Sequence, residues 1–289
     1  MGPTILNLGA PIPEAGEKGN RMGRSKAIPL FPHPALLLEK GGERALVIAD
    51  LHIGWEMALS EQGIHIPSQT RRFLERILGL IRDHEPSLLI LLGDVKHTIA
   101  KADMAEWRDV PEFLDALRRS VREVVLVPGN HDGGIDPLLP SGIKVLGASG
   151  MRLWDRYGLL HGHAWPGPEL LECDLLIMAH MHPTVTLSDP LGFRIIQQVW
   201  IRGRCDRGGL RERVGRRKAG VGKRGDLDCL IMPSFNDFLG GQSINRGDLG
   251  EVEYIGPILR SGLMELGESD VYMLDGTYLG KAKGLIRGD

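Results

Sequence analysis

Residues 45–54 read Ala-Leu-Val-Ile-Ala-Asp-Leu-His-Ile-Gly, an aliphatic run that turns abruptly into Asp50 and His52. Five aliphatic residues in a row, bounded by polar groups, are typical of a strand that is buried on both faces. Residues two apart in an extended segment point the same way, so Asp50 and His52 can face one cavity. The stretch therefore predicts a polar site where a buried strand ends.

The same unit recurs four more times along the chain. The aliphatic runs are 88–92, 124–127, 159–160 and 175–178, and the motifs that follow them are Gly93-Asp94, Gly129-Asn130-His131-Asp132, His161-Gly162-His163 and His180-Met181-His182. Open α/β sheets bind ligands at the carboxyl ends of their strands, so we expect these motifs to converge on one site. Asp and His are unfavourable at buried strand ends unless they are paired or ligated, which argues against a purely structural role.

Helical patterns separate these runs. Ser68 is a good helix N-cap, and apolar residues follow it at spacings of three and four up to Ile81. A second pattern, 113–117, follows Pro111, which suits the first turn of a helix. Alternation of strands and helices is typical of layered α/β proteins.

From about Thr184 the sequence reads mostly as strand and turn. Strand-like runs cover 193–200 and 229–232, and Asp275-Gly276 joins two further runs as a hairpin. No proline- or serine-rich linker separates this half from the first. We therefore expect residues 28–289 to form one α/β domain with two packed sheets.

The overall composition excludes several protein classes. The 289 residues include 35 Lys or Arg and 37 Asp or Glu, so the chain is not a globally basic nucleic-acid binder. Three cysteines form no disulfide framework, and no apolar run has the roughly 18 residues of a membrane helix. Residues 1–27 lack a signal-peptide stretch and are expected to be a disordered tail. We expect a cytoplasmic protein that does not associate with membranes.

The segment 202–224 is strongly basic. It carries ten Lys or Arg residues against two acids, Asp206 and Glu212, which gives a local charge of +8. Its six glycines and few apolar residues favour a flexible insertion at about 202–226. Such an insertion is either a solvated mobile loop or a contact for the phosphate backbone of DNA. It has no aromatic residue for base stacking, which argues against strong selectivity for single strands.

The candidate ligands are carboxylate, amide and imidazole groups, without a thiolate. This set suits Mn²⁺, Fe, Zn²⁺ or Ni²⁺ better than a structural zinc site or an all-oxygen Ca²⁺ site. The ligands are too many for one tetrahedral ion and sufficient for two ions that share a bridging carboxylate. We expect two divalent ions, with Mn²⁺ as the first choice.

The order of the motifs resembles the calcineurin-like metallophosphoesterase superfamily. The resemblance covers residues 50–182, with Ala179 where the family usually has glycine. It implies a four-layer α/β/β/α sandwich of two mixed sheets flanked by helices. Residues 50–54, 92–97 and 233–236 further resemble an archaeal branch related to the SbcD nuclease and to DNA-ligase-associated phosphoesterases.

The resemblance also implies roles for individual residues. It implies that the first metal is held by Asp50, His52 and His182, that the second is held by Asn130, His161 and His180, and that Asp94 bridges both. His131 is then a catalytic residue beside the leaving group rather than a ligand, and Asp132 orients its ring.

The choice of His161 over His163 as ligand rests on its position, because His161 directly ends the 159–160 run. His163 is then expected behind the ligands or facing the substrate. His97, just past Asp94, is expected to contact the phosphate or to lie on the surface, and Asn236 is expected at the rim.

The charges suggest a mechanism. Two divalent ions and two carboxylates leave a net charge of +2, which lowers the pKa of a bridging water and provides a hydroxide to attack phosphorus. His131 would protonate the departing oxygen.

Three functions follow from this site. The first is a phosphodiesterase or nuclease acting on DNA in repair, with DNA held by residues 202–224 and, by analogy, a DNA-repair protein as partner. The second is a phosphoesterase for nucleotides or other small molecules. The third is a non-catalytic scaffold, which is disfavoured because such proteins usually lose ligands or the acid histidine and this chain has them all.

Overall fold

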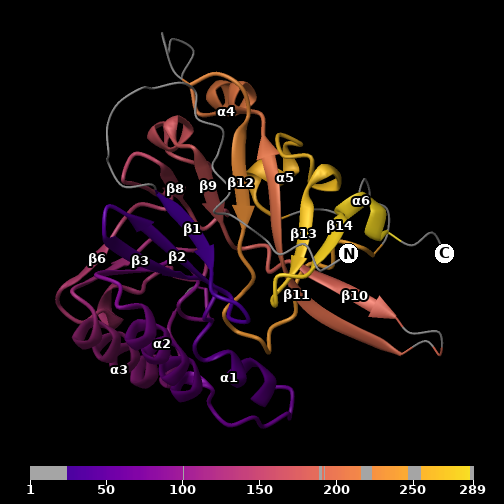
Figure 1. Cartoon of the computed structure of the whole chain (residues 1–289). Coiled ribbons are helices and arrows are strands. Elements are labelled where there is room, and N and C mark those ends of the chain that lie inside the picture. Colours follow the sequence, from indigo (N-terminus) through magenta and orange to yellow (C-terminus); the bar gives the residue numbers. More distant parts are fainter. Residues whose placement is uncertain are drawn as a thin grey trace.

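The computed structural model describes residues 25–99, 101–188, 191, 193–215, 223–246 and 255–286. Two β-sheets pack face to face, and helices cover their outer faces (Figure 1). The expected α/β sandwich of two mixed sheets is therefore confirmed. Most of the predicted tail, 1–24, lies outside the described residues, but its predicted end at residue 27 is wrong because Lys26 and Ala27 already belong to a strand.

The first sheet contains six strands in sequence order. They are β1 (Lys26–Pro29), β2 (Ala35–Lys40), β3 (Glu43–Ile48), β4 (Leu88–Leu91), β5 (Glu123–Leu126) and β6 (Ile143–Val145). β3 to β6 run parallel, whereas β1 and β2 add antiparallel strands at the edge. In β3, Leu46 and Ile48 face the helices while Ala45 and Val47 face the other sheet, which explains the unbroken aliphatic run.

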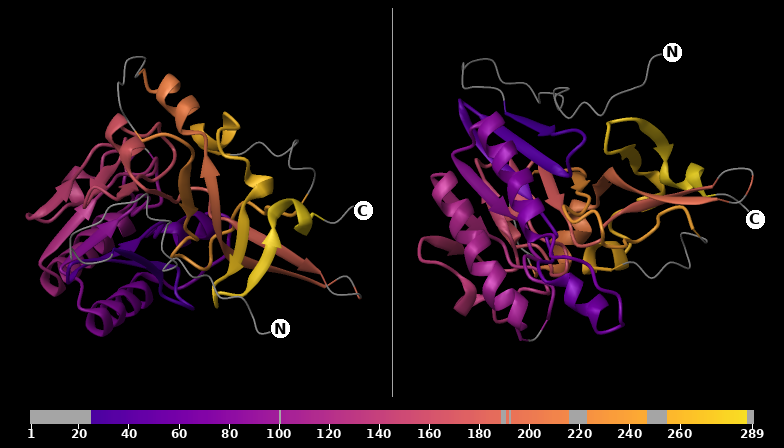
Figure 2. Two further views of the ribbon diagram at one scale, coloured as in Figure 1. Left: turned by 45° about the horizontal axis from the view of Figure 1, so that its top comes forward. Right: turned by 90° about the horizontal axis from the view of Figure 1, so that it is seen from below.

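The second sheet has the order β14-β13-β11-β12-β9-β8-β7, with β10 paired to β11. Its strands are β7 (Met151–Leu153), β8 (Tyr157–Leu159), β9 (Leu175–Met178), β10 (Thr184–Ser188), β11 (Arg194–Cys205), β12 (Leu227–Ile231), β13 (Asp270–Met273) and β14 (Tyr278–Lys281). β8, β9 and β12 are parallel neighbours and the other pairs are antiparallel, including the predicted hairpin of β13 and β14. The β10–β11 hairpin projects from the body (Figure 2).

Three apolar cores separate four layers. The first lies between the first sheet and the helices α2 and α3, the second between the sheets, and the third on the outer face of the second sheet. The helices are α1 (Trp55–Ser60), α2 (Thr70–His84), α3 (Met104–Ser120), α4 (Arg207–Arg213), α5 (Pro257–Arg260) and α6 (Ala282–Leu285), with 3₁₀ turns at Asp136–Leu138, Pro168–Glu172 and Leu266–Glu268. None of the described helices is long and apolar enough to cross a bilayer.

Two helix starts differ from the prediction. α2 begins at Thr70 after the N-cap Gln69, so Ser68 lies one residue before the cap position. The Ser68 hydroxyl donates to the Thr70 hydroxyl at 3.0 Å and accepts from the Thr70 amide at 3.4 Å. α3 begins seven residues before Pro111, which therefore lies inside the helix. Its start is fixed by a capping box in which Asp103 accepts from the Glu106 amide and the Glu106 carboxylate accepts from the Asp103 amide.

The basic segment is more ordered than predicted. Residues 202–205 belong to β11, and Arg207–Arg213 form α4, whose cap Asp206 accepts from the Gly208 amide at 2.9 Å. Arg207 is buried and donates to the backbone carbonyls of Leu171 and Cys173, which anchors the helix to the 3₁₀ turn before β9. The expectation of a flexible insertion is therefore wrong for these parts, and residues 216–222 lie outside the described chain.

Candidate metal centre

The five predicted motifs meet at one place, where parallel strands of both sheets end. β3, β4 and β5 of the first sheet lead into Asp50, Asp94 and Asn130, and β8 and β9 of the second lead into His161 and His180. This is the convergence expected from the carboxyl ends of buried strands.

A first group of side chains consists of Asp50, His52, Asp94 and His182. One ligand atom from each lies within 4.8 Å of those of the others. The Nε2 atom of His182 lies 3.3 Å from Asp50 Oδ1, and the Nε2 atom of His52 lies 3.5 Å from Asp94 Oδ2. The two Nε2 atoms lie 3.4 Å apart.

A second group consists of Asp94, His161 and His180, again within 4.8 Å of one another. The Nε2 atom of His161 lies 3.3 Å from Asp94 Oδ2 and 3.2 Å from His180 Nδ1. Asp94 belongs to both groups, as a bridging carboxylate must. His163 lies beside this group, with its ring centroid 5.3 Å from that of His161.

The donor atoms of these groups fit divalent ions. A ring nitrogen of His52 faces one of His182, and a ring nitrogen of His161 faces one of His180. Only one proton can lie between the two nitrogens of each pair. The Oδ1 atom of Asn130 is buried without a hydrogen-bond partner among the described residues, and Asn130 lines the same cavity as Asp94 and His180. Cations shared by imidazole, carboxylate and amide groups would satisfy all of these atoms.

The backbone at the centre is strained. Asp50, His52, Asp94, His180 and His182 all have left-handed φ angles, between 46° and 68°. Non-glycine residues avoid this region, and such strain is concentrated at functional sites. Gly93 also has a positive φ, and a Cβ atom there would lie 2.2 Å from His161 Nδ1, so the Gly-Asp motif needs its glycine.

In the absence of a bound cation, burial and the neighbouring carboxylates shift the pKa values of the histidines in opposite directions. Burial alone would lower the pKa of His161, but Asp94 and Asp50 outweigh it and raise the pKa to about 9. Burial lowers the pKa of His52 to about 3. Burial and the neighbouring His161 lower the pKa of His180 to about 4.

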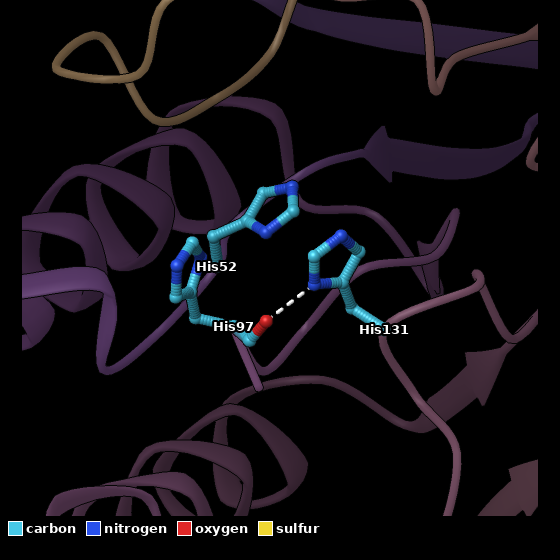
Figure 3. Close-up of side chains that lie close together, drawn as sticks. All are labelled: His52, His97 and His131. Carbon is cyan, nitrogen blue, oxygen red and sulfur yellow. Dashed lines mark hydrogen bonds between the residues drawn. The ribbon is translucent and has the colours of Figure 1, made fainter. Parts of the chain in front are cut away.

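His131 lies at the edge of the first group. Its backbone amide donates to Asp94 Oδ1 at 2.8 Å, and its Nε2 atom lies 4.0 Å from Asp94 Oδ2. Its Nδ1 atom is hydrogen-bonded to the backbone carbonyl of His97 (Figure 3). A carbonyl can only accept, so Nδ1 carries the proton and Nε2 faces the centre.

The predicted role of Asp132 is wrong. Its buried carboxylate accepts from the backbone amides of Asp94 and Gly129 at 2.8 Å and of Val95 at 2.9 Å, rather than from His131. The Asp132 carboxylate therefore fixes the backbone that carries the shared Asp94, and the His97 carbonyl orients His131.

Two further residues hold the loop after Asp94. The buried Lys96 ammonium donates to the carbonyls of Thr98 and His131, so it faces neither phosphate nor solvent. The buried Glu106 carboxylate accepts from the amides of His97 and Thr98 at 2.8 and 2.7 Å. Sequence reasoning missed Glu106, although the Asp-x-x-Glu pattern at 103–106 signals a capping box.

His97 and Asn236 differ in their positions. The ring of His97 lies against those of His52 and His131, with centroids 5.5 and 5.7 Å away (Figure 3). Asn236 is fully buried, donates to the Leu51 carbonyl at 3.1 Å and accepts from the Phe238 amide at 3.0 Å. The expectation of a rim residue is therefore wrong for Asn236, which supports the loop of the first motif.

Two cavities open at the centre, and both are lined by Asn130 and His180. The first, about 410 Å³, also has His52, Asp94, His131 and His182 in its wall. The second, about 570 Å³, has His163, Trp165, Arg213 and Arg260 in its wall. A third cavity, about 800 Å³, is lined by none of the candidate ligands and by six carboxylate residues: Asp206, Asp226, Asp228, Glu265, Glu268 and Asp270.

Comparison with known proteins gives a family match and structural neighbours. The calcineurin-like phosphoesterase family matches residues 43–206, more than half of the chain. A crystal structure of a Pseudomonas putida nuclease MPE is similar, with a TM-score of 0.52 and 19% identity over 88% of this chain and 99% of that one. The phosphoesterase Yfce from E. coli has a TM-score of 0.37 and 17% identity over 82% and 97% of the two chains. No curated protein matches the chain.

Proposed function

This chain belongs to the calcineurin-like phosphoesterase family and is a hydrolase of ester bonds, and from that premise we propose that it hydrolyses phosphodiester bonds in DNA. The observation that carries the proposal is the pair of ligand groups that share Asp94, with His131 beside them and a cavity on either side of Asn130 and His180. A shared carboxylate between two ions is the arrangement used for in-line displacement at phosphorus.

We assign the ligands by group. The first divalent ion takes Asp50, His52 and His182, the second takes Asn130, His161 and His180, and Asp94 serves both. Divalent ions bound there would supply a Lewis acid and an activated water for attack on phosphorus. Mn²⁺ is our first choice, with Fe, Zn²⁺ and Ni²⁺ as alternatives, because the donors are oxygen and imidazole nitrogen.

His131 is the proposed general acid. The His97 carbonyl holds Nδ1–H, so in the doubly protonated imidazolium the Nε2–H is left to donate its proton to the departing oxygen. The oxygen of water bonds to phosphorus as the bond to the departing oxygen breaks. The proton lost by the attacking water goes to solvent, from which His131 is reprotonated.

DNA is the proposed substrate because of the basic segment. Arg213, at the end of α4, lines the cavity next to the second group, so the +8 segment reaches the centre. The pattern at 50–54 and 233–236 supports the branch related to the SbcD nuclease, and with it a cytoplasmic role in DNA repair beside a repair-protein partner. The nuclease from Pseudomonas putida supports the fold alone at 19% identity.

A second candidate function is a phosphoesterase for nucleotides. Cavities of about 410 and 570 Å³ are of the size that takes one small molecule, which favours this alternative over a scaffold.

The test compares bis-p-nitrophenyl phosphate with end-labelled DNA in the presence of Mn²⁺, each with a chelator control. Chelator-sensitive cleavage of both substrates is the expected result. Cleavage of the dye alone would replace the proposal with the nucleotide alternative. If protein that is shown to contain bound metal cleaves neither substrate, the non-catalytic scaffold is the function that remains.

A further inference from the structure

The 570 Å³ cavity beside the second ligand group is lined by different side chains from the 410 Å³ cavity at the centre. It shares Asn130 and His180 with the cavity at the centre, but His131 lines only the other one. A group bound in it therefore lies on the side of the phosphate away from the proposed general acid. In an in-line displacement the attacking water and the departing oxygen lie on opposite sides of phosphorus and the retained ester substituent lies between them, so a cavity beside the second ligand group suits that substituent.

The wall of this cavity favours an anion. Arg213 contributes a guanidinium group to the wall, and none of the described lining residues has a carboxylate. The 800 Å³ cavity shows the contrast, since its six carboxylates outnumber its three cationic side chains. Guanidinium groups bind phosphate oxygens through paired hydrogen bonds, so a phosphate suits this wall.

The same wall offers a surface for a base. Trp165 is half-buried and packs against the outer core of the second sheet, and Pro257 lies in the same wall. An indole ring stacks on any base, and alanine substitution of such a ring costs about 1–3 kcal/mol per base. The basic segment 202–224 contains no aromatic residue, so Trp165 supplies the aromatic ring on which a base can stack.

The cavity is tied rigidly to the centre. Gly256 precedes α5 with a φ of 85°, and a Cβ atom there would lie 2.5 Å from the Gly162 carbonyl oxygen. The segment that carries Pro257 and Arg260 is therefore packed directly on the loop between His161 and His163. Any ligand held by this segment is held at a fixed place relative to the second group.

We propose that this cavity binds the nucleotide that stays attached to the scissile phosphate, with its base against Trp165 and its outer phosphate at Arg213. This subsite rests on the proposed function and narrows its substrate to single-stranded DNA or a frayed end. A volume of about 570 Å³ accommodates one unstacked nucleotide rather than a duplex.

Binding tests the subsite without cleavage. The probe is a fluorescein-labelled, 5′-phosphorylated thymidine trinucleotide, and its anisotropy is measured with the full chain in a chelator. We expect Trp165→Ala and Arg213→Ala each to weaken binding at least about fivefold, and Arg213→Ala to flatten the salt dependence by roughly one phosphate contact. Arg204→Ala is the matched control, because Arg204 belongs to the same basic segment but lines the 800 Å³ cavity.

The outcomes separate the two proposals. Wild-type affinity in both Trp165→Ala and Arg213→Ala, or an equal loss in Arg204→Ala, would overturn the subsite even if the enzyme cleaves DNA. Retained binding without DNA cleavage in Mn²⁺ would overturn the proposed function, and with it the assignment of this nucleotide to a scissile phosphate, but not the binding of a nucleotide in the cavity. Arg213→Lys separates charge from geometry, since a partial loss there supports paired hydrogen bonds to phosphate. Unchanged thermal unfolding of each variant checks that it is folded.

Discussion

The part of the chain up to and including His182 and the part after it contribute to the same site in different ways. The first part supplies all seven candidate ligands and His131, each within a few residues of a buried strand of three to six residues. The second part supplies cavity walls, among them Arg213 and Arg260, from short helices far apart in the sequence. The chemistry is thus encoded locally, whereas the shape that selects a substrate depends on long-range packing.

The largest effect should come from Asp94, which both ligand groups share. We expect Asp94→Asn to reduce activity on every phosphate ester to the level of chelator-treated enzyme, because the amide cannot bridge two cations. Steady-state rates and metal content by mass spectrometry measure the effect. Asp155→Asn, at an exposed turn, is the matched control. If the variant kept activity on any one substrate, the chemistry of that substrate would not depend on Asp94, and the proposed division between local chemistry and long-range substrate selection would be wrong.

The next effect concerns His131. We expect His131→Asn to lower kcat by about 10²–10⁴-fold while metal content stays the same, because general acid catalysis contributes that much. The loss should be larger for DNA, whose leaving group is a poor one, than for p-nitrophenyl esters. His65→Asn, on an exposed surface, serves as control. Equal losses on both substrates would contradict the assignment of a general acid.

A smaller effect is expected from Lys96, which holds the loop around His131. Lys96→Met keeps the aliphatic chain but leaves buried carbonyls without a donor, which costs about 1–3 kcal/mol of unfolding free energy. A small displacement of His131 should also reduce kcat by about 10- to 100-fold. Chemical denaturation and kinetics with Lys101→Met as control measure both effects. An unchanged kcat would show that the loop does not set the position of His131.

The smallest expected effect is the number of protons that are released when metal binds. The pKa of His161 is raised from 6.5 to about 9 in the metal-free centre, so at pH 7.5 this side chain is protonated, whereas His52 and His180, at about 3 and 4, are neutral. Asp50 outweighs burial and also raises the pKa of His182. Metal binding needs the neutral rings, so it should release the proton of His161 and up to one more from His182, and it should weaken as the pH falls below 9. Calorimetry in buffers of different ionisation enthalpy counts the protons. Release of none, or of three, would contradict this electrostatic picture.

Local patterns predicted the strands and the convergence of their motifs, since each strand and its motif are consecutive in sequence. The prediction failed where a side chain's partner is distant in the sequence, and where a residue next to another in the sequence does not contact it. Asp132 follows His131 directly, yet the turn directs its carboxylate to the amides of Asp94 and Gly129. Arg213 and Trp165 meet in one cavity only through the packing of the second sheet.

The helix starts failed for a different reason. Pro111 suits the first turn of a helix, but the reciprocal pair of hydrogen bonds at Asp103 and Glu106 sets the start of α3 seven residues earlier. Ser68 is a good cap by propensity, but α2 begins after Gln69, which makes no side-chain cap bond. In α4, the anchoring of Arg207 overrides the low helix propensity of Gly208 and Gly209.

The left-handed backbone at the five ligand positions bears on how this chain can change over generations. Each such residue costs roughly 1–2 kcal/mol relative to a glycine, which adopts this conformation freely. In the absence of bound metal, replacing Asp50 or His182 with glycine would relieve strain while removing a ligand. Mutational drift away from catalysis is therefore energetically downhill at these sites. The five side chains are therefore expected to serve metal binding at a cost to the stability of the metal-free chain.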